Sequence, residues 1–268
     1  MKNSIIILGI RLTFLFFMLS QVALAQYTNL PLGYNYSLNF GDDIFKNIEH
    51  SSFKPIILSS ENLDVESIIE KKFSSNSDFL ESRIFNKHLI ELSGEDYYVG
   101  GSLISNLSVG KEMEASLNTF VNTRGFIIDG FIGDRVSFQT SFLENQAVFP
   151  NYIDSLIRTQ DFVIPGQGRG RTYYDNGFDY ARSSGFVSVE ASDNFIVQFG
   201  HGKHFIGDGY RSLLLSDNSF NYPFLRLQSN FAKFQYTNLY CEFQDMKNYL
   251  SSENGYDYMG YAKKYMSA

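Results

Sequence analysis

The glycine-rich run Gly166-Gln-Gly-Arg-Gly-Arg171 places two guanidinium groups on a flexible backbone. Arginine binds carboxylate and phosphate groups through paired hydrogen bonds, so a loop of this kind is able to hold an anion. The run is not a dinucleotide-binding fingerprint, because no strand-to-helix turn with a third correctly spaced glycine surrounds it. Two interpretations stay open: an anion-binding loop, or a solvated glycine-rich loop that binds nothing.

A second basic segment, from Lys203 to Arg211, follows a predicted strand. If the strands between the two segments run alternately up and down, both segments emerge at the same end of the sheet. They would then form one basic patch on an acidic chain, with Tyr173 and Tyr174 available to pack on sugar rings. The candidate glycan-binding residues are Arg169, Arg171, Lys203, His204, Tyr210 and Arg211.

His201 and His204 are the residues that most resemble metal ligands. Residues three apart on a strand point to opposite faces, so the two imidazoles cannot converge on one metal ion. Lys203, which lies between them, would also repel a cation. We predict two hydrogen-bonded histidines at a strand end, and neither a metal nor a cofactor.

Catalytic motifs are scarce in this chain. It has no Gly-x-Ser-x-Gly nucleophile elbow, and Cys241 has no histidine near it in the sequence, so we interpret this thiol as a buried small hydrophobe. Asp208 and Asp217 flank Arg211 and resemble a carboxylate pair for glycosidic cleavage, but ion pairing or turn formation is their more ordinary role. We predict that the protein is not an enzyme.

Alternation of apolar and polar residues predicts that most of the chain after residue 96 forms β-strands. Phe (26) and Tyr (18) are abundant, and aromatic residues favour strands. The faces of the predicted strand Arg124–Phe131 are not assigned by the pattern. Elsewhere the predicted polar face holds Gln139, Glu190, Gln198, Arg226 and Gln235, and the predicted apolar face holds Phe138, Phe142, Val197, Phe199 and Phe234.

The connections between the predicted strands alternate in length. In an up-and-down meander every second connection lies at the same end, so one end has short turns and the other has long loops. This asymmetry is typical of transmembrane β-barrels. A soluble β-sandwich, which also alternates apolar and polar residues, is the alternative. Short turns are predicted at Gly133-Asp134, Ser192–Asn194 and Asn230–Ala232, and long links at Pro150–Ser184, Ile206–Tyr222 and Asp245–Gly255.

The predicted fold class is all-β: an antiparallel up-and-down transmembrane β-barrel of the outer-membrane type, with residues 96–268 as its amino-terminal part. The polar face would line a wet lumen and the apolar face would contact lipid. We predict seven strands and an eighth beginning near Tyr256, whereas bacterial barrels need at least eight. Because the pattern stops midway near Lys264, we expect a fragment of a longer protein that cannot close a barrel alone.

Residues 1–25 show the order of a secretory signal peptide, with Lys2 and Arg11, an apolar stretch and the small-residue end Val22-Ala-Leu-Ala25. Export is therefore expected, with the mature chain beginning at Gln26. Residues 26–95 are predicted to be a periplasmic lead-in containing one short amphipathic helix over Asn62–Phe73.

The net charge excludes nucleic acid as a partner. The whole chain has 22 basic and 29 acidic residues, which gives −7. Loss of Lys2 and Arg11 with the signal peptide leaves 20 basic residues and a charge of −9. Binding to phosphates needs the opposite sign.

The long run from His201 to Pro223 is accompanied by five shorter motifs in a fixed order. These are Tyr97-Tyr-Val-Gly-Gly-Ser-Leu103, Asn122-Thr-Arg-Gly-Phe126, Glu144-Asn-Gln-Ala-Val-Phe-Pro150, Pro165-Gly-Gln-Gly-Arg169 and Lys264-Tyr-Met266. Together they resemble the RemB/Wzi-like outer-membrane proteins over roughly residues 95 to 266.

This resemblance implies an outer-membrane protein that holds or organises surface exopolysaccharide without turning it over, in capsule assembly, gliding motility or adhesion. The implied partners are outer-membrane lipid, an anionic surface polysaccharide, and motility or secretion machinery. A porin-like diffusion channel is one alternative, and an outer-membrane hydrolase is another. The motifs do not separate a RemB-type role from a Wzi-type role.

Overall fold

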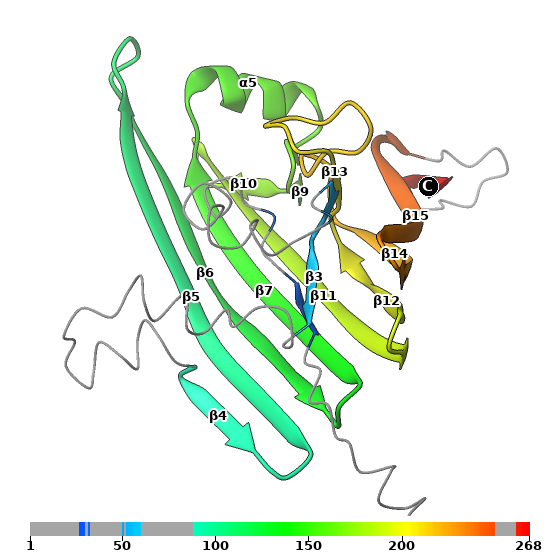
Figure 1. Ribbon diagram of the computed structural model, residues 1–268. Coiled ribbons are helices and arrows are strands. Elements are labelled where there is room, and N and C mark those ends of the chain that lie inside the picture. Colours follow the sequence, from blue (N-terminus) through cyan, green and yellow to red (C-terminus); the bar gives the residue numbers. More distant parts are fainter. Residues whose placement is uncertain (1–26, 30–31, 33–49, 51, 60–87, 250–260) are drawn as a thin grey trace, which may run out of the picture.

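The computed structural model describes residues 27–29, 32, 50, 52–59, 88–249 and 261–268. Its main element is an antiparallel sheet of ten strands in the order β16-β15-β14-β12-β11-β7-β6-β5-β4, with β10 pairing beside β11 (Figure 1). The strands are β4 (Ile90–Ser93), β5 (Tyr97–Glu112), β6 (Leu117–Ile132), β7 (Val136–Val148), β10 (Arg171–Tyr173), β11 (Gly177–Ser192), β12 (Phe195–Gly202), β14 (Tyr222–Phe231), β15 (Phe234–Tyr249) and β16 (Tyr261–Ser267).

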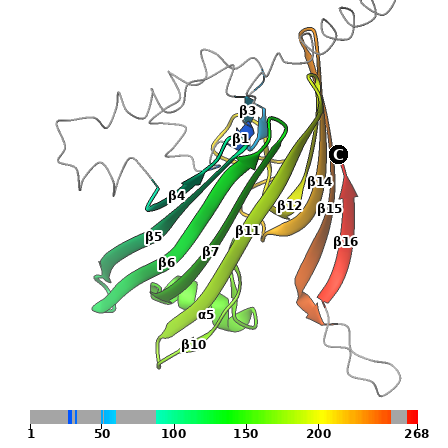
Figure 2. The same cartoon turned by 90° about the horizontal axis from the view of Figure 1, so that it is seen from below.

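The predicted all-β class and the up-and-down meander are confirmed, since strands that are neighbours in this sheet also follow one another along the chain. Within the described residues the sheet curls but does not close, and β4 and β16 form its two edges (Figure 2). No helix among these residues is long and apolar enough to cross a membrane.

The predicted asymmetry of the connections is also present. Tight turns join β6 to β7, β11 to β12 and β14 to β15 at one end of the sheet, here called the short-turn end. The links 149–176 and 203–221 lie at the opposite, long-loop end, together with the tip of the β5–β6 hairpin (Figure 1).

Strand register separates the side chains onto two faces, because directly paired residues of neighbouring strands share a face. One row reads Ser137, Ser188, Gln198, Arg226 and Leu239, and we call its face inward. The adjacent row reads Phe138, Val187, Phe199, Leu225 and Tyr240, and its face is outward.

The predicted sorting of polar and apolar residues agrees with this register. It also assigns the strand segment that the sequence pattern left open. Phe126 pairs with the outward Phe142, whereas Asp129 pairs with the inward Gln139. The same strand therefore sends a large ring outward and a carboxylate inward.

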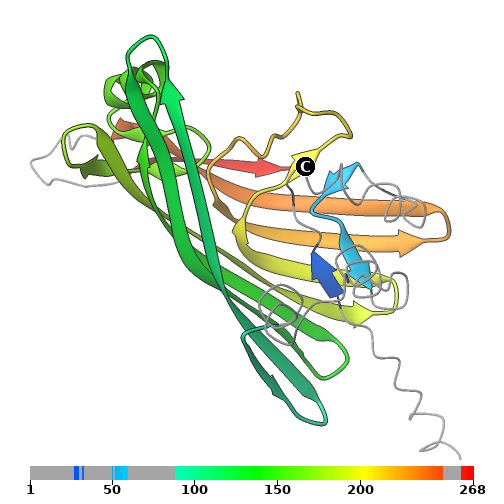
Figure 3. The same cartoon turned by 90° about the vertical axis from the view of Figure 1, so that its left-hand side faces the viewer.

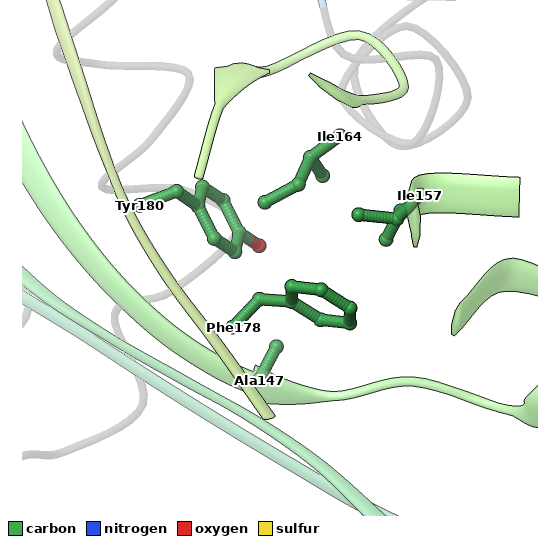
Figure 4. Packing of buried hydrophobic residues seen from close by; sticks show 5 residues of the cluster. All are labelled: Ala147, Ile157, Ile164, Phe178 and Tyr180. Atoms are coloured by element: carbon green, nitrogen blue, oxygen red, sulfur yellow. The ribbon is translucent and has the colours of Figure 1, made fainter. Parts of the chain in front are cut away.

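The helix α5 (Asn151–Thr159) covers the long-loop end of the inward face and was missed by the sequence analysis, which assigned Pro150–Ser184 to a loop. Its apolar residues Ile153, Leu156 and Ile157 follow helical spacing, and Asp154 forms an ion pair with Arg158 one turn later at 2.8 Å. Figure 4 shows the resulting core, which consists of Ala147, Ile157, Ile164, Phe178 and Tyr180.

A second core fills the inward face near β14 and β15. Its buried members are Leu215, Tyr222, Phe224, Leu239 and Cys241. Cys241 is thus the buried hydrophobe that the sequence predicted. Phe53, which is distant in sequence, packs against this core together with Ile206.

The described parts of the predicted lead-in, residues 26–95, do not form a separate unit, because β4 is an edge strand of the main sheet and residues 27–29 and 52–59 lie against its inward face. The strands β1 (Tyr27–Asn29) and β3 (Ile57–Ser59) pair with each other, and β2 (Phe53–Lys54) pairs with β13 (Phe205–Ile206) in the long-loop link. Figures 1 and 3 show this blue and cyan segment within the curl of the sheet. The signal peptide 1–25 and the predicted helix Asn62–Phe73 lie outside the described residues.

Candidate functional site

The two basic segments singled out in the sequence meet at the long-loop end. The Lys203 ammonium donates a hydrogen bond to the backbone carbonyl of Gly166. Gly166 also has a positive φ of 70°, and a Cβ atom there would lie 2.9 Å from the Asn218 side chain. Glycine is therefore needed where the run 166–171 packs against the link 203–221.

Each arginine of the glycine-rich run has an acidic neighbour. Arg169 pairs with Asp161, just after the helix, and Arg171 pairs with Asp179 on β11 at 3.0 Å. The Arg171 side chain nevertheless stays 80 % exposed, whereas that of Arg169 is 28 % exposed. Arg171 is the better placed of the two to meet a large ligand, and Arg169 mainly fixes the loop.

Lys203 lies in a half-buried position. Its pKa is lowered to about 8, mainly by burial and also by the charge of the nearby Arg182, while Asp217 opposes the shift. Desolvation disfavours the charged ammonium, so Lys203 contributes less positive charge to the surface than the sequence analysis assumed.

Tyr210 and Arg211 form the exposed tip of the link 203–221. The Arg211 guanidinium lies 5.4 Å from the centre of the Tyr210 ring, within the range of a cation–π contact. Asp208 pairs with Lys54 at 3.2 Å, and Asp217 accepts a hydrogen bond from Ser216. Asp208 thus forms an ion pair with the distant Lys54, and Asp217 accepts its hydrogen bond from a neighbouring residue of the link.

The two histidines behave as hydrogen-bonded strand-end residues. The exposed His201 contacts the carbonyl of Ser183 through Nδ1 at 3.2 Å. His204 is fully buried, and its Nδ1 lies 3.1 Å from the Tyr222 hydroxyl. Burial and the charge of Arg226 lower the His204 pKa to about 3, so its imidazole is neutral and out of reach of a glycan.

Exposed aromatic and basic groups also gather around the β10–β11 turn. The Tyr174 ring is 84 % exposed and makes an edge contact with Tyr173 at 4.6 Å between ring centres. Arg158 of α5 donates to the backbone carbonyl of Asp175 in this turn. The sequence analysis missed Arg158, although its spacing from Asp154 was a usable signal for a helix.

A third polar group lies on the inward face near the short-turn end. His88 contacts the Ser102 hydroxyl through Nδ1 at 2.9 Å, and its Nε2 lies 3.5 Å from Asp129. The ring rests on Gly100, where any Cβ atom would overlap it. The His88–Asp129 distance is that of an ion pair rather than a close hydrogen bond, and we interpret the group as a polar bridge between β5 and β6.

Among the residues that the structure describes, no group of three or more His, Cys, Asp or Glu side chains is arranged to hold a metal ion. Comparison with protein-family models, with curated proteins and with solved structures gives no match for this chain.

Proposed function

We propose that this protein is an outer-membrane protein of the β-barrel type, which binds or organises anionic exopolysaccharide at the cell surface. The observation that carries the proposal is the exposed apolar outward face. Phe199 is 51 % exposed, Tyr240 is 46 % exposed and Phe142 is 41 % exposed. Large apolar surfaces of this kind mark contact with lipid or a partner.

Lipid is the favoured contact because the inward face is the more polar of the two. In a soluble sheet the polar residues face water, whereas a membrane barrel turns its apolar residues outward to the acyl chains. Leu103, Leu107 and Val109 extend the apolar surface over β5, where each is more than half exposed. Outer membrane is therefore the proposed location.

The long-loop end is the proposed binding surface, since the long loops of bacterial outer-membrane barrels lie outside the cell. It presents Arg171 and Arg211 for carboxylate or phosphate groups, and Tyr174 and Tyr210 for sugar rings. Arg169 and Lys203 hold the loops together behind these residues. We leave His204 out of the proposed site, because it is fully buried.

Two alternatives lack a supporting observation. A porin needs a wet interior, whereas the inward-facing Gln198 and Arg226 are fully buried. A glycosidase acting through Asp208 would need that carboxylate for acid–base chemistry, whereas it pairs with Lys54. A role in capsule assembly or gliding, with motility or secretion machinery as partners, is part of the proposal and rests on the resemblance alone.

Binding of an acidic polysaccharide to the protein in outer-membrane vesicles tests the glycan part of the proposal. We expect Arg169→Ala with Arg171→Ala to weaken retention about tenfold, equivalent to about 1.4 kcal/mol. The matched control is Arg135→Ala with Lys233→Ala, which removes two exposed charges at the short-turn end. Equal retention by both double variants would remove the glycan-binding proposal and leave the membrane proposal standing.

A further inference from the structure

Residues 52–59, here called the plug segment, contact the inward face far from their position in the sequence. The Arg226 guanidinium donates to the carbonyl of Pro55 at 2.6 Å and lies 4.5 Å from the centre of the Phe53 ring. Nearby, Gln198 donates to the side chain of Asn29 at 3.1 Å. The two hydrogen bonds join residues that are 171 and 169 positions apart.

The plug segment is also joined to the long-loop end. Lys54 donates to the carbonyl of Gly207 at 2.9 Å and forms its ion pair with Asp208. The backbone N–H of Gly207 donates in return to the carbonyl of Ser52. The segment thus spans from the middle of the inward face to the loop at its end.

The inward polar residues near the plug segment are shielded from solvent. Ser188, Gln198, Arg226 and Gln228 each expose 2 % of their surface or less. Several of their polar groups bond to one another, as in the hydrogen bonds from Gln198 to Ser188 and from Arg226 to Gln228, whereas Gln198 Oε1 and Arg226 Nε are buried without a hydrogen-bond partner among the described residues. Such side chains would otherwise line a water-filled interior.

The hydrogen bonding of the main sheet does not depend on the plug segment. Within the sheet, β12 lies between β11 and β14, and β14 lies between β12 and β15. The backbone hydrogen bonds on both sides of Gln198 and Arg226 are therefore made without β2 or β3. The segment is held by side-chain contacts, by a two-residue pairing of β2 with β13 and by the pairing of β3 with β1, neither of which belongs to the main sheet. Its removal would break no ladder of the main sheet.

We propose that the plug segment is a removable seal that keeps water and small hydrophilic solutes out of the interior, and that its displacement opens a polar path along β12 and β14. Arg226 is the anchor, since its guanidinium meets both the carbonyl of Pro55 and the ring of Phe53. The seal itself follows from contacts within the chain. It rests on the proposed function only for the identity of the compartments that it separates.

Thiol labelling of the full chain in outer-membrane vesicles tests the seal. Ser188→Cys, combined with Cys241→Ser to remove the only native cysteine, places a reporter on the buried inward face. A charged, water-soluble maleimide is the probe. We expect replacement of residues 53–59 by a Gly/Ser sequence of equal length to raise the labelling rate at least tenfold.

Replacement of residues 113–116 by Gly/Ser, at the tip of the β5–β6 hairpin, is the matched control and leaves the rate unchanged. Asn176→Cys in the same Cys241→Ser background gives the rate of an exposed thiol in the β10–β11 turn at the long-loop end, away from the face that we assign to lipid. The seal is disproved if the Ser188→Cys thiol reacts as fast as the Asn176→Cys thiol in the otherwise unaltered chain. An equal rate with and without residues 53–59 disproves it as well.

A cross-link keeps the test decisive if the replaced chain fails to fold. Lys54→Cys with Phe205→Cys, again with Cys241→Ser, places two thiols at directly paired positions of β2 and β13, one of them within the plug segment. We expect a disulfide to form under mild oxidation, and its failure to form would overturn the position of the segment. Sedimentation of the protein with membranes is measured in parallel. If the Ser188→Cys thiol is protected but the protein does not sediment with membranes, the proposed function is disproved and the seal is not.

Discussion

Two neighbouring rows of the sheet have opposite character although they differ by one position along each strand. The inward row of Ser188, Gln198 and Arg226 is polar and buried, with exposed fractions of 1 %, 0 % and 1 %. In the outward row, Phe199 and Leu225 are apolar and exposed at 51 % and 38 %. A soluble domain has the reverse arrangement, because burial of apolar surface drives its folding.

This difference shows that the two faces depend on different surroundings. The inward face is completed by the chain itself, through α5 at one end and the plug segment in the middle. Among the residues that the structure describes, none covers the outward face, and we propose that lipid covers it. Variants that place the same change on each face test this interpretation most directly.

The largest expected effect comes from a lysine on the outward face. Phe142→Lys places an ammonium group in the middle of β7, among the side chains that we assign to lipid, at a cost of about 2–4 kcal/mol near the midplane. Gln139→Lys places the same group on the inward face, across from Asp129. We expect the first variant to lose outer-membrane assembly, measured by fractionation and heat-modifiable migration, and the second to keep it. Equal assembly of both variants would break the comparison.

A smaller but clear effect is expected from the buried arginine. Arg226→Ala leaves the carbonyl of Pro55 and the Gln228 side chain without their donor, and lowers the free energy of unfolding by about 3 kcal/mol or more. Arg135→Ala is the control, because Arg135 is exposed in the tight turn between β6 and β7, away from both faces of the sheet. Denaturant unfolding in lipid should show a much smaller loss for the control, and similar losses would contradict the dry interior.

The pH dependence of stability tests the burial of His204 on the inward side of the molecule. Its pKa in the fold is about 3, so the unfolded chain binds more protons between pH 6.5 and 3. The free energy of unfolding should therefore fall as the pH drops through this range, by up to about 1.4 kcal/mol per pH unit. His204→Phe should remove this contribution, whereas the exposed His201→Phe should keep it. The slopes of unfolding free energy against pH provide the check.

The smallest expected effect concerns Lys203, whose pKa is lowered to about 8, so it affects the free energy of unfolding at alkaline pH. Between pH 8 and its ordinary value of 10.5 the unfolded chain holds the proton that the folded chain has lost. Stability from this group therefore rises with pH across that window. Lys203→Met should flatten the rise relative to the wild type, and Lys233→Met in the β14–β15 turn should not. If the free energy of unfolding of Lys203→Met still rose with pH as in the wild type, Lys203 would be solvated in the native protein and not half-buried.

The residues around Phe138 illustrate what could be predicted from the sequence. Strand side chains alternate with period two, so the pattern sorted Phe138 and Gln139 onto opposite faces before any fold was known. The strand Arg124–Phe131 was not assigned, because Phe126, Ile127 and Ile128 are apolar in succession. Only pairing with β7 decided which of them face outward.

The candidate site was predicted less well. The meeting of the Gly166 run with Lys203 followed from the alternation of the connections and is confirmed by their hydrogen bond. The acidic partners of Arg169 and Arg171 were not foreseen, because each lies eight residues away along an irregular path. The buried state of His204 depends on Phe53, Tyr222 and Phe224, whose rings surround it from distant parts of the chain.

The sequence alone therefore determined the strands, their two faces and the alternation of short and long connections, since these follow from local periodicity and turn residues. The tertiary structure alone decided that the inward polar residues are dry. Pro55 and Arg226 are separated by 171 positions, and no local pattern encodes which distant carbonyl a guanidinium will meet. That choice depends on the shape of the curled sheet and on which segment fills it.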